Sequence, residues 1–200
     1  NYIGWVDTNL RLRIDGVAPT HVSNSILNAR YVNGSDYWVR PNDSLNVRLR
    51  QNDPHSGNRI QYLRLDGGGQ DVRSLHTFHG SETYNERFRL SENDRVTIAS
   101  ALREEEENSS YGKVLWGVTP KTHGHSYDVL YYFEDNARNS STDYTSTGKK
   151  IRVDGESPLL VSESITNYRY KNGNDYWIRP NDSVQLSIRG RDYDSGLKDT

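Results

Sequence analysis

The chain has 200 residues, 32% of them apolar and 26% charged, with a net charge of −2 and neither cysteine nor methionine. The missing cysteines exclude a disulfide scaffold and a thiolate zinc site, and a pI near 6.3 gives no electrostatic footprint for nucleic acid. No apolar run approaches the roughly 20 residues that span a bilayer, so no transmembrane segment is expected.

Short segments of alternating apolar and polar residues predict β-strands along the whole chain. In order they cover residues 22–27, 45–49, 60–65, 95–101, 113–118, 127–133 and 149–153. Turn residues separate them: Asn33-Gly34 fits a two-residue hairpin loop in which both residues have positive φ, and Pro41 fixes φ in the next turn. Only residues 91–107 could be partly helical. About seven short strands with regular turns predict an all-β antiparallel sandwich.

An internal repeat predicts the domain organisation. Residues 13–57 align without a gap onto residues 152–196, at an offset of 139, and 25 of the 45 aligned positions are identical. We expect the two segments to adopt the same backbone, and the second to need a partner for its apolar face. The expected parts are residues 1–14, the final strand of a preceding repeat or a linker; residues 15–153, a complete repeat; and residues 154–200, the opening strands of the next repeat.

The end of the complete unit carries a series of motifs. Residues 126–140 read SYDVLYYFEDNARNS, residues 151–158 read IRVDGESP, and acidic loops end in Ser-Gly at Gly57 and Gly196. These motifs resemble bacterial immunoglobulin-like (Big-type) tandem repeats of large surface or secreted proteins. The resemblance implies antiparallel immunoglobulin-like β-sandwich repeats. Residues 67–121 match no part of that pattern, so we expect an enlarged middle region.

Carboxylates and amides gather at the predicted loop ends and at the repeat junctions. In a sandwich of this kind, the loop after the second main strand and the loop before the last strand meet at one pole, where their oxygens could hold calcium. The resemblance also implies calcium at module junctions. The alternative is that these residues only form turns. The candidate ligands are Asp15, Asp53, Asp135, Asn136, Asp154, Asp192 and Asp194.

Histidine and tryptophan side chains give two further candidate sites. His76 with His79, or His123 with His125, could bind zinc, but no carboxylate motif accompanies them and surface histidines are the favoured interpretation. Tyr37-Trp38 and Trp116 could form a sugar-stacking platform. Because the block around Trp38 recurs in the second copy, we expect Trp38 to belong to the core.

No nucleophile–base, zinc-protease or phosphate-loop motif occurs, so a non-enzymatic role is expected. The resemblance implies a structural or spacer repeat of an extracellular or cell-surface protein, in a stalk, S-layer or filament-like assembly. Its partners would be neighbouring repeats of the same protein, with self-assembly by β-strand addition as a variant. No cofactor is required apart from the candidate calcium. The alternatives are an adhesin or carbohydrate-binding module that contacts glycans or a host surface, and an accessory domain of an extracellular hydrolase.

Overall fold

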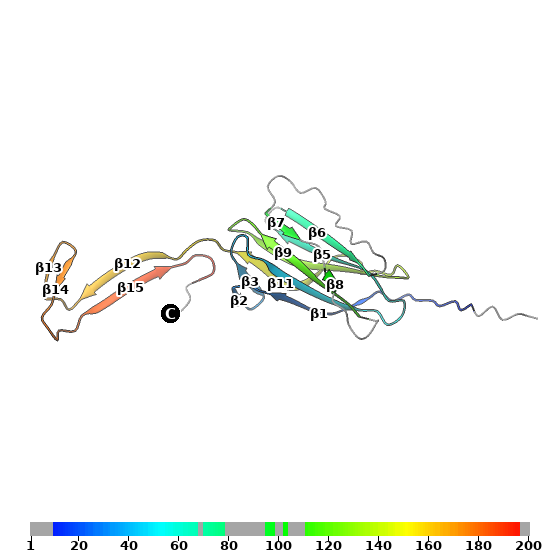
Figure 1. The fold of residues 1–200 in the computed structure, drawn as a ribbon, viewed down its shortest axis with the longest axis horizontal. Helices are drawn as coiled ribbons and strands as arrows, with labels where there is room; N and C mark the ends of the chain where they lie inside the picture. Colours follow the sequence, from blue (N-terminus) through cyan, green and yellow to red (C-terminus); the bar gives the residue numbers. More distant parts are fainter. Residues whose placement is uncertain (1–9, 68–69, 79–94, 99–101, 104–110, 197–200) are drawn as a thin grey trace, which may run out of the picture.

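A computed structural model describes residues 10–67, 70–78, 95–98, 102–103 and 111–196, and among these residues every regular element is a β-strand. Two parts are visible in Figure 1: a body formed by residues 20–153, and a thin ribbon formed by residues 159–191 that extends away from it. The all-β prediction is confirmed. No helix in the described part of the chain is long and apolar enough to cross a membrane.

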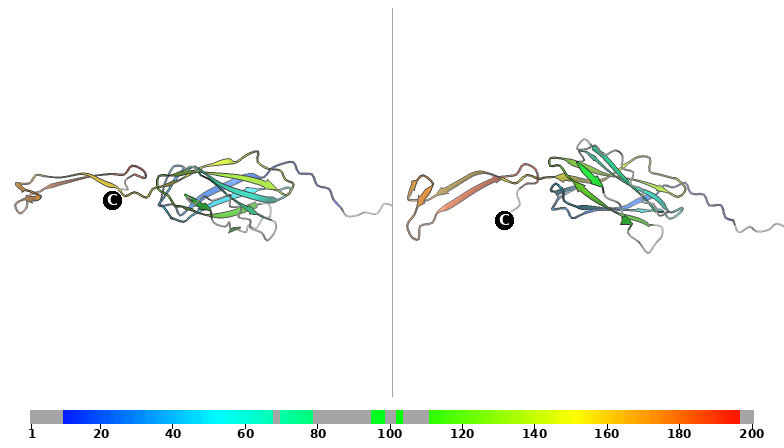
Figure 2. Two further views of the ribbon diagram at one scale, coloured as in Figure 1. Left: turned by 90° about the horizontal axis from the view of Figure 1, so that it is seen from above. Right: turned by 45° about the horizontal axis from the view of Figure 1, so that its top comes forward.

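The body consists of two sheets packed face to face, as the two views of Figure 2 show. One sheet has the order β1 (Thr20–Leu27), β4 (Leu45–Asn52), β9 (Tyr111–Pro120) and β7 (Val96–Ile98), with β8 (Leu102–Arg103) also paired to β9. The other has the order β2 (Tyr31–Asn33), β3 (Asp36–Val39), β11 (Thr145–Val153), β10 (Ser126–Asp135), β5 (Asn58–Gly67) and β6 (Gln70–Thr77). Neighbouring strands are antiparallel except β3 and β11, which are parallel.

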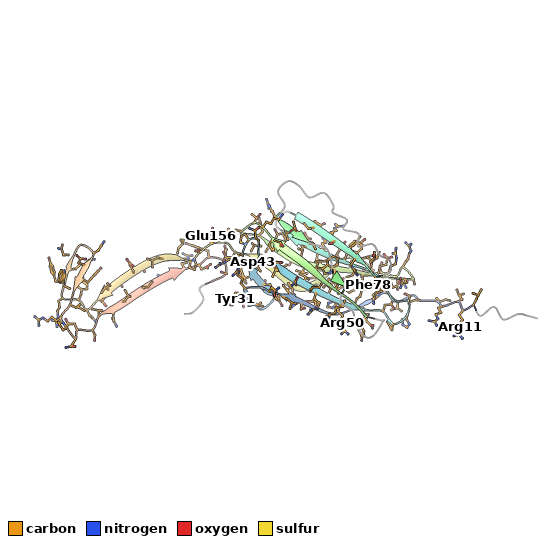
Figure 3. All side chains as sticks on the ribbon, viewed as in Figure 1. Arg11, Tyr31, Asp43, Arg50, Phe78 and Glu156 are labelled. Atoms are coloured by element: carbon orange, nitrogen blue, oxygen red, sulfur yellow. The ribbon has the colours of Figure 1, made fainter. Side chains whose placement is uncertain are left out.

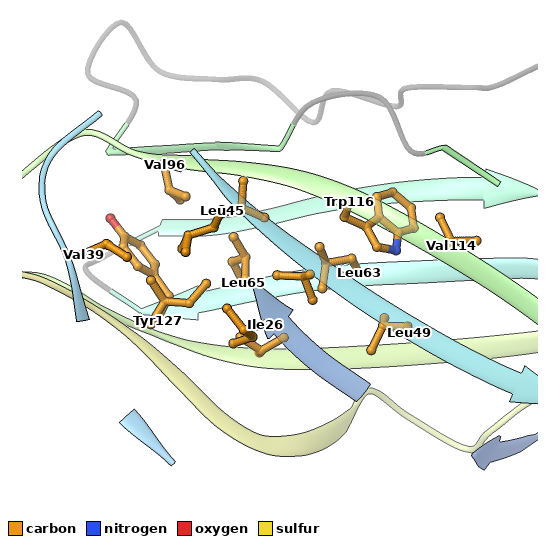
Figure 4. Close-up of a cluster of buried hydrophobic side chains, with 14 of the residues drawn as sticks. Ile26, Val39, Leu45, Leu49, Leu63, Leu65, Val96, Val114, Trp116 and Tyr127 are labelled. Atoms are coloured by element: carbon orange, nitrogen blue, oxygen red, sulfur yellow. The ribbon is translucent and has the colours of Figure 1, made fainter. Parts of the chain in front are cut away.

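The core lies between the two sheets and follows from the alternation of apolar residues. Leu45, Val47 and Leu49 on β4 point inward, and their exposed fractions are 0%, 1% and 0%. They meet Leu63 and Leu65 from β5 and inward residues of β9, β10 and β11 (Figure 4). The alternating pattern of the sequence therefore places the inner face of each long strand correctly.

Trp116, and not Trp38, is the core tryptophan. Trp116 is completely buried, and its indole nitrogen lies 3.4 Å from Oε1 of Gln61. Trp38 is only half-buried, and the guanidinium of Arg152 lies over its ring, 5.5 Å from the centroid. The expectation of a core Trp38 is wrong because its neighbour Val39 takes the inward position on β3.

The turns are fixed by residues with positive φ. Asn33 pairs with Asp36, so the hairpin loop consists of Gly34 and Ser35, and Gly34 has a φ of 59°. The prediction that Asn33 shares the positive φ is wrong, because a turn with glycine first needs positive φ only there. In the next turn, Pro41 precedes Asn42, which has a φ of 68°.

Asp43 closes this second turn through charged hydrogen bonds. Its carboxylate accepts hydrogen bonds from Nε and Nη2 of Arg30 at 2.6 and 2.8 Å, and from the amide of Arg40 at 2.8 Å. The bond from Arg30, helped by the amide of Arg40, lowers the pKa of Asp43. Arg169 and Asp182 repeat the arrangement in the second copy, where the bond from Arg169 lowers the pKa of Asp182 to about 2.

Asp43→Asn is therefore expected to destabilise the sandwich by about 1 kcal/mol at pH 7. A lowered native-state pKa gives stability that is present above the unfolded-state pKa of about 4 and is lost as the pH falls through the native value. The difference between wild type and variant in thermal melts should therefore shrink below pH 4. Asp182→Asn is the matched control, since it changes the same contact in the ribbon. An equal loss of sandwich stability in both variants would contradict this prediction.

The ribbon repeats the first strands of the body at a constant offset. Its strands are β12 (Leu159–Thr166), β13 (Tyr170–Asn172), β14 (Asp175–Trp177) and β15 (Gln185–Arg191), and each lies within one residue of the equivalent first-copy strand plus 139. β1 and β4 pair from Thr20↔Asn52 with an irregularity after His21. β12 and β15 pair from Leu159↔Arg191 with an irregularity at the equivalent position, after Leu160, which is the counterpart of His21. The two segments thus have the same strands, the same register and the same irregularity.

Two other expectations fall partly outside the described residues. Within residues 91–107, where a partial helix was expected, the described parts are the strands β7 and β8. The rest of that stretch lies outside the described residues, as do residues 1–9. Residues 10–14, expected to be the end of a final strand, have no regular secondary structure. The proposed domain boundaries stay predictions.

Candidate metal centre

Three aspartates from distant parts of the sequence meet at one pole of the sandwich. Asp15 lies on the segment before β1, Asp53 directly follows β4, and Asp135 is the last residue of β10. The register explains the meeting, because Asp135 pairs with Asn58 at the start of β5, next to the loop that contains Asp53. One carboxylate oxygen from each of the three aspartates lies within 4.8 Å of the other two.

Two of the three carboxylates are buried. Asp53 is 2% exposed and Asp135 is 0% exposed, while Asp15 is half-buried. Burial of like charges so close together disfavours the ionised state unless something compensates it. The cluster is therefore an electrostatically demanding arrangement for a folded protein.

Neutral donors supply the hydrogen bonds of the cluster. Asp53 accepts hydrogen bonds from the amide of His55 at 2.8 Å and the hydroxyl of Ser56 at 3.1 Å. Asp135 accepts hydrogen bonds from the amide and the side-chain nitrogen of Asn139, both at 2.8 Å. These bonds orient the carboxylates without neutralising them, so oxygen lone pairs remain available for a cation.

Asp15 connects the segment before the sandwich to this pole. Its carboxylate accepts hydrogen bonds from the amide of Val17 at 3.0 Å and the amide of Ser56 at 3.1 Å. Hydrogen bonding from Ser56, followed by that from Val17, lowers the pKa of Asp15 and keeps it ionised. A charged Asp15 is the form that a metal ion would bind.

Asparagine side chains hold the loops of the pole together. The side-chain nitrogen of Asn136 donates to the carbonyls of Ser56 and Gly57 at 2.9 and 3.1 Å. Asn136 thus links two loops through its nitrogen, and its expected ligand role stays a prediction. The sequence analysis missed Asn139, which also donates to the carbonyl of Asp15 at 3.2 Å. The sequence feature that could have identified Asn139 is its position in the loop directly after Asp135.

The start of the ribbon repeats part of this arrangement. Asp154 accepts hydrogen bonds from the amides of Glu156 and Ser195, as Asp15 does from those of Val17 and Ser56. Asp192 accepts hydrogen bonds from the amide of Asp194 at 2.9 Å and the hydroxyl of Ser195 at 3.4 Å. Asp154 and Asp192 are thus the counterparts of Asp15 and Asp53. A counterpart of Asp135 is not among the described residues.

Asp194 lies in a different group from the one predicted. Its carboxylate is 3.6 Å from Nε2 of His123, which is also 3.2 Å from a carboxylate oxygen of Glu156. Figure 3 shows Glu156 at the passage from the body into the ribbon. Nδ1 of His123 accepts the amide hydrogen of Gly155 at 2.9 Å, so in the neutral ring Nε2 carries the proton. Nε2 then has no lone pair for a metal, and the group fits a hydrogen-bonded junction better than a zinc site.

In the described part of the chain, the remaining histidine and tryptophan candidates do not come together in a second centre. His76 is buried on β6, and its expected partner His79 lies outside the described residues. His125 lines a small, open hollow together with Trp38, Arg152 and Asp194. Trp38 and Trp116 do not form a joint sugar platform, because Trp116 is buried in the core.

The donor set at the pole distinguishes between metals. Three carboxylates supply oxygen ligands only, the preference of hard cations such as calcium, whereas zinc sites usually contain histidine or thiolate. The carboxylates present therefore fit calcium.

Comparison of the chain with known protein families finds no family model that matches. Comparison with curated proteins likewise finds no similar sequence.

Proposed function

We propose that this chain is a non-enzymatic structural segment of an extracellular or cell-surface bacterial protein, built from immunoglobulin-like repeats that calcium stiffens at their junctions. The observation that carries the proposal is the repetition, at an offset of 139, of both the strand register and the carboxylate contacts at the head of each repeat. Repeats with the same internal geometry and the same junction chemistry suit a tandem array that works as a spacer.

The strand order supports the immunoglobulin-like part of the proposal. A β1–β4–β9–β7 sheet faces a β2–β3–β11–β10–β5–β6 sheet, and the chain crosses to the second sheet at the β2–β3 hairpin, in which β3 is parallel to β11. Two antiparallel sheets in which one early strand changes sheets are typical of immunoglobulin-like sandwiches. Beyond the sandwich itself, this classification rests on the order of strands and on the sequence motifs.

Calcium would act on the junction by joining three separate segments. Asp15, Asp53 and Asp135 belong to the entry segment, the β4–β5 loop and the end of β10. A divalent cation bound by all three would neutralise buried negative charge and would fix the entry segment to the sandwich. The metal would thus compensate the charge of the three carboxylates and cross-link the three segments that carry them.

The expected result is a higher melting temperature of the chain in calcium than in excess chelator. A ligand that binds only the folded state stabilises it by about 2.7 kcal/mol at 100 times its dissociation constant. Differential scanning calorimetry in calcium, in magnesium and in chelator measures this effect. A melting temperature that is equal in all three conditions would reject the calcium part of the proposal.

One observation favours a second function, a binding module. Tyr62, Tyr132 and Tyr144 form a cluster on the outer face of the β5–β10 sheet, with ring centroids 5.6 to 6.3 Å apart. The guanidinium groups of Arg64 and Arg73 lie 5.1 and 5.2 Å from the centroid of Tyr144. Aromatic rings flanked by hydrogen-bond donors can bind sugars. Glycan-array binding that disappears in Tyr132→Ala would favour this function over the spacer.

A further inference from the structure

The ribbon exposes the same apolar face that the body buries. Leu186 and Ile188 on β15 are 64% and 65% exposed, whereas their first-copy counterparts Val47 and Leu49 are 1% and 0% exposed. Ile178 and Val184 are likewise 48% and 43% exposed, whereas their first-copy counterparts Val39 and Leu45 are 2% and 0% exposed. A contiguous apolar face of this kind marks a surface that binds another polypeptide.

The first copy shows what covers this face. The buried cluster contains five residues from the first copy, namely Ile26, Val39, Leu45, Val47 and Leu49, and every other member belongs to residues 58–153. The covering residues lie on β5, β7, β9, β10 and β11 and in the segment after β6. In the body, the apolar face of residues 20–52 is therefore covered by residues 58–153.

The open edges of the ribbon require the same partner. β4 pairs with β9 over eight residue pairs, from Leu45↔Val118 to Asn52↔Tyr111, and β3 pairs in parallel with β11. In the ribbon, β15 pairs only with β12, and β14 only with β13, among the described strands. An occupant must therefore provide a face of apolar side chains and also two strands that extend the β15 and β14 edges.

We propose that the ribbon is the acceptor half of a sandwich and that it binds a β-segment of the type formed by residues 58–153. This inference rests on the repeat character in the proposed function. The segment must come from outside residues 58–153 of the same copy, because β1, β3 and β4 already occupy those residues. Exchange of residues 58–153 between copies gains nothing, because each such layer already covers the apolar face of residues 20–52.

Face-to-face packing of two ribbons is a weaker solution. Two ribbons from separate copies would cover the apolar face of each other. They would leave the β15 edge, the counterpart of the edge that β9 occupies in the first copy, without a neighbouring strand. Unpaired strand edges in an otherwise buried sheet are costly. The occupant is therefore a strand-rich segment and not a second ribbon.

The test uses the full chain and one extension of it. In the extended chain, residues 58–153 follow Gly196, which has nearly the same φ as Gly57, 82° against 85°, so the join repeats the natural geometry. Hydrogen exchange of the amides of residues 185–191 is measured by mass spectrometry in both chains. A covered ribbon should exchange on the order of 100-fold more slowly than the exposed one.

The control is the extended chain with Leu186→Asp and Ile188→Asp, which should restore fast exchange in residues 185–191. Equal exchange in the original and extended chains would overturn the proposal. Protection from exchange in the original chain that becomes stronger as the protein concentration rises would also overturn it, because the occupant would then be a second copy. The calcium response of the body is a separate measurement, so either hypothesis can fail alone.

Discussion

Trp116→Ala is expected to lower the free energy of unfolding of the sandwich by about 3–5 kcal/mol, the usual range for a large buried aromatic residue. Trp116 is completely buried between the two sheets, in the middle of β9 and close to Val114 (Figure 4). Its removal leaves a cavity that neighbouring strands, each fixed by hydrogen bonds on both sides, cannot close. Urea unfolding followed by circular dichroism measures the loss.

Trp38→Ala is the matched control for this substitution. Trp38 is half-buried on the outer face and has the Arg152 guanidinium over its ring, so its loss is expected to cost at most about 1.5 kcal/mol. Trp177→Ala, the same change in the exposed ribbon, should leave the unfolding of the sandwich unchanged. A larger effect for Trp38 than for Trp116 would contradict the assignment of the core.

The difference between these tryptophans shows where sequence reasoning reaches its limit. On long strands such as β4 and β9, many alternating positions identify the inner face. β3 has only four residues, and both Trp38 and Val39 are plausible inward residues on size and apolarity. Parallel pairing with β11 decides, because Val39 lies beside Val153 and faces the core with it. That pairing joins residues more than 100 positions apart, and no local pattern contains it.

The candidate metal centre was predictable to a similar extent. Loop-end carboxylates in a sandwich are brought to a pole, and this reasoning correctly brings Asp15, Asp53 and Asp135 together. The role of Asn139 and the place of Asp194 beside His123 depend on loop conformation, which composition does not determine.

The strand β6 was missed because residues 70–77 lack regular alternation, with Ser74, Leu75 and His76 buried in succession.

Asp135→Asn is expected to change stability in calcium but hardly in chelator. In chelator, the variant loses repulsion from Asp15 and Asp53. It also loses one of the two hydrogen bonds that Asn139 donates, because the asparagine side chain has only one acceptor oxygen, so the two effects offset each other to within about 1 kcal/mol. In calcium, the variant lacks one of three anionic ligands. The stabilisation by calcium, about 2.7 kcal/mol at 100 times the dissociation constant for the wild type, should then largely disappear.

Asp143→Asn is the control for this experiment, because Asp143 is exposed and is not a member of the three-carboxylate cluster. The measurement is the difference in melting temperature between calcium and chelator for wild type and both variants. Calcium should raise the melting temperature of the wild type and of Asp143→Asn equally, and that of Asp135→Asn far less. If Asp135→Asn responds to calcium like the wild type, any bound calcium lies elsewhere. The buried carboxylates at the pole would then serve only to orient the loops through Ser56 and Asn139.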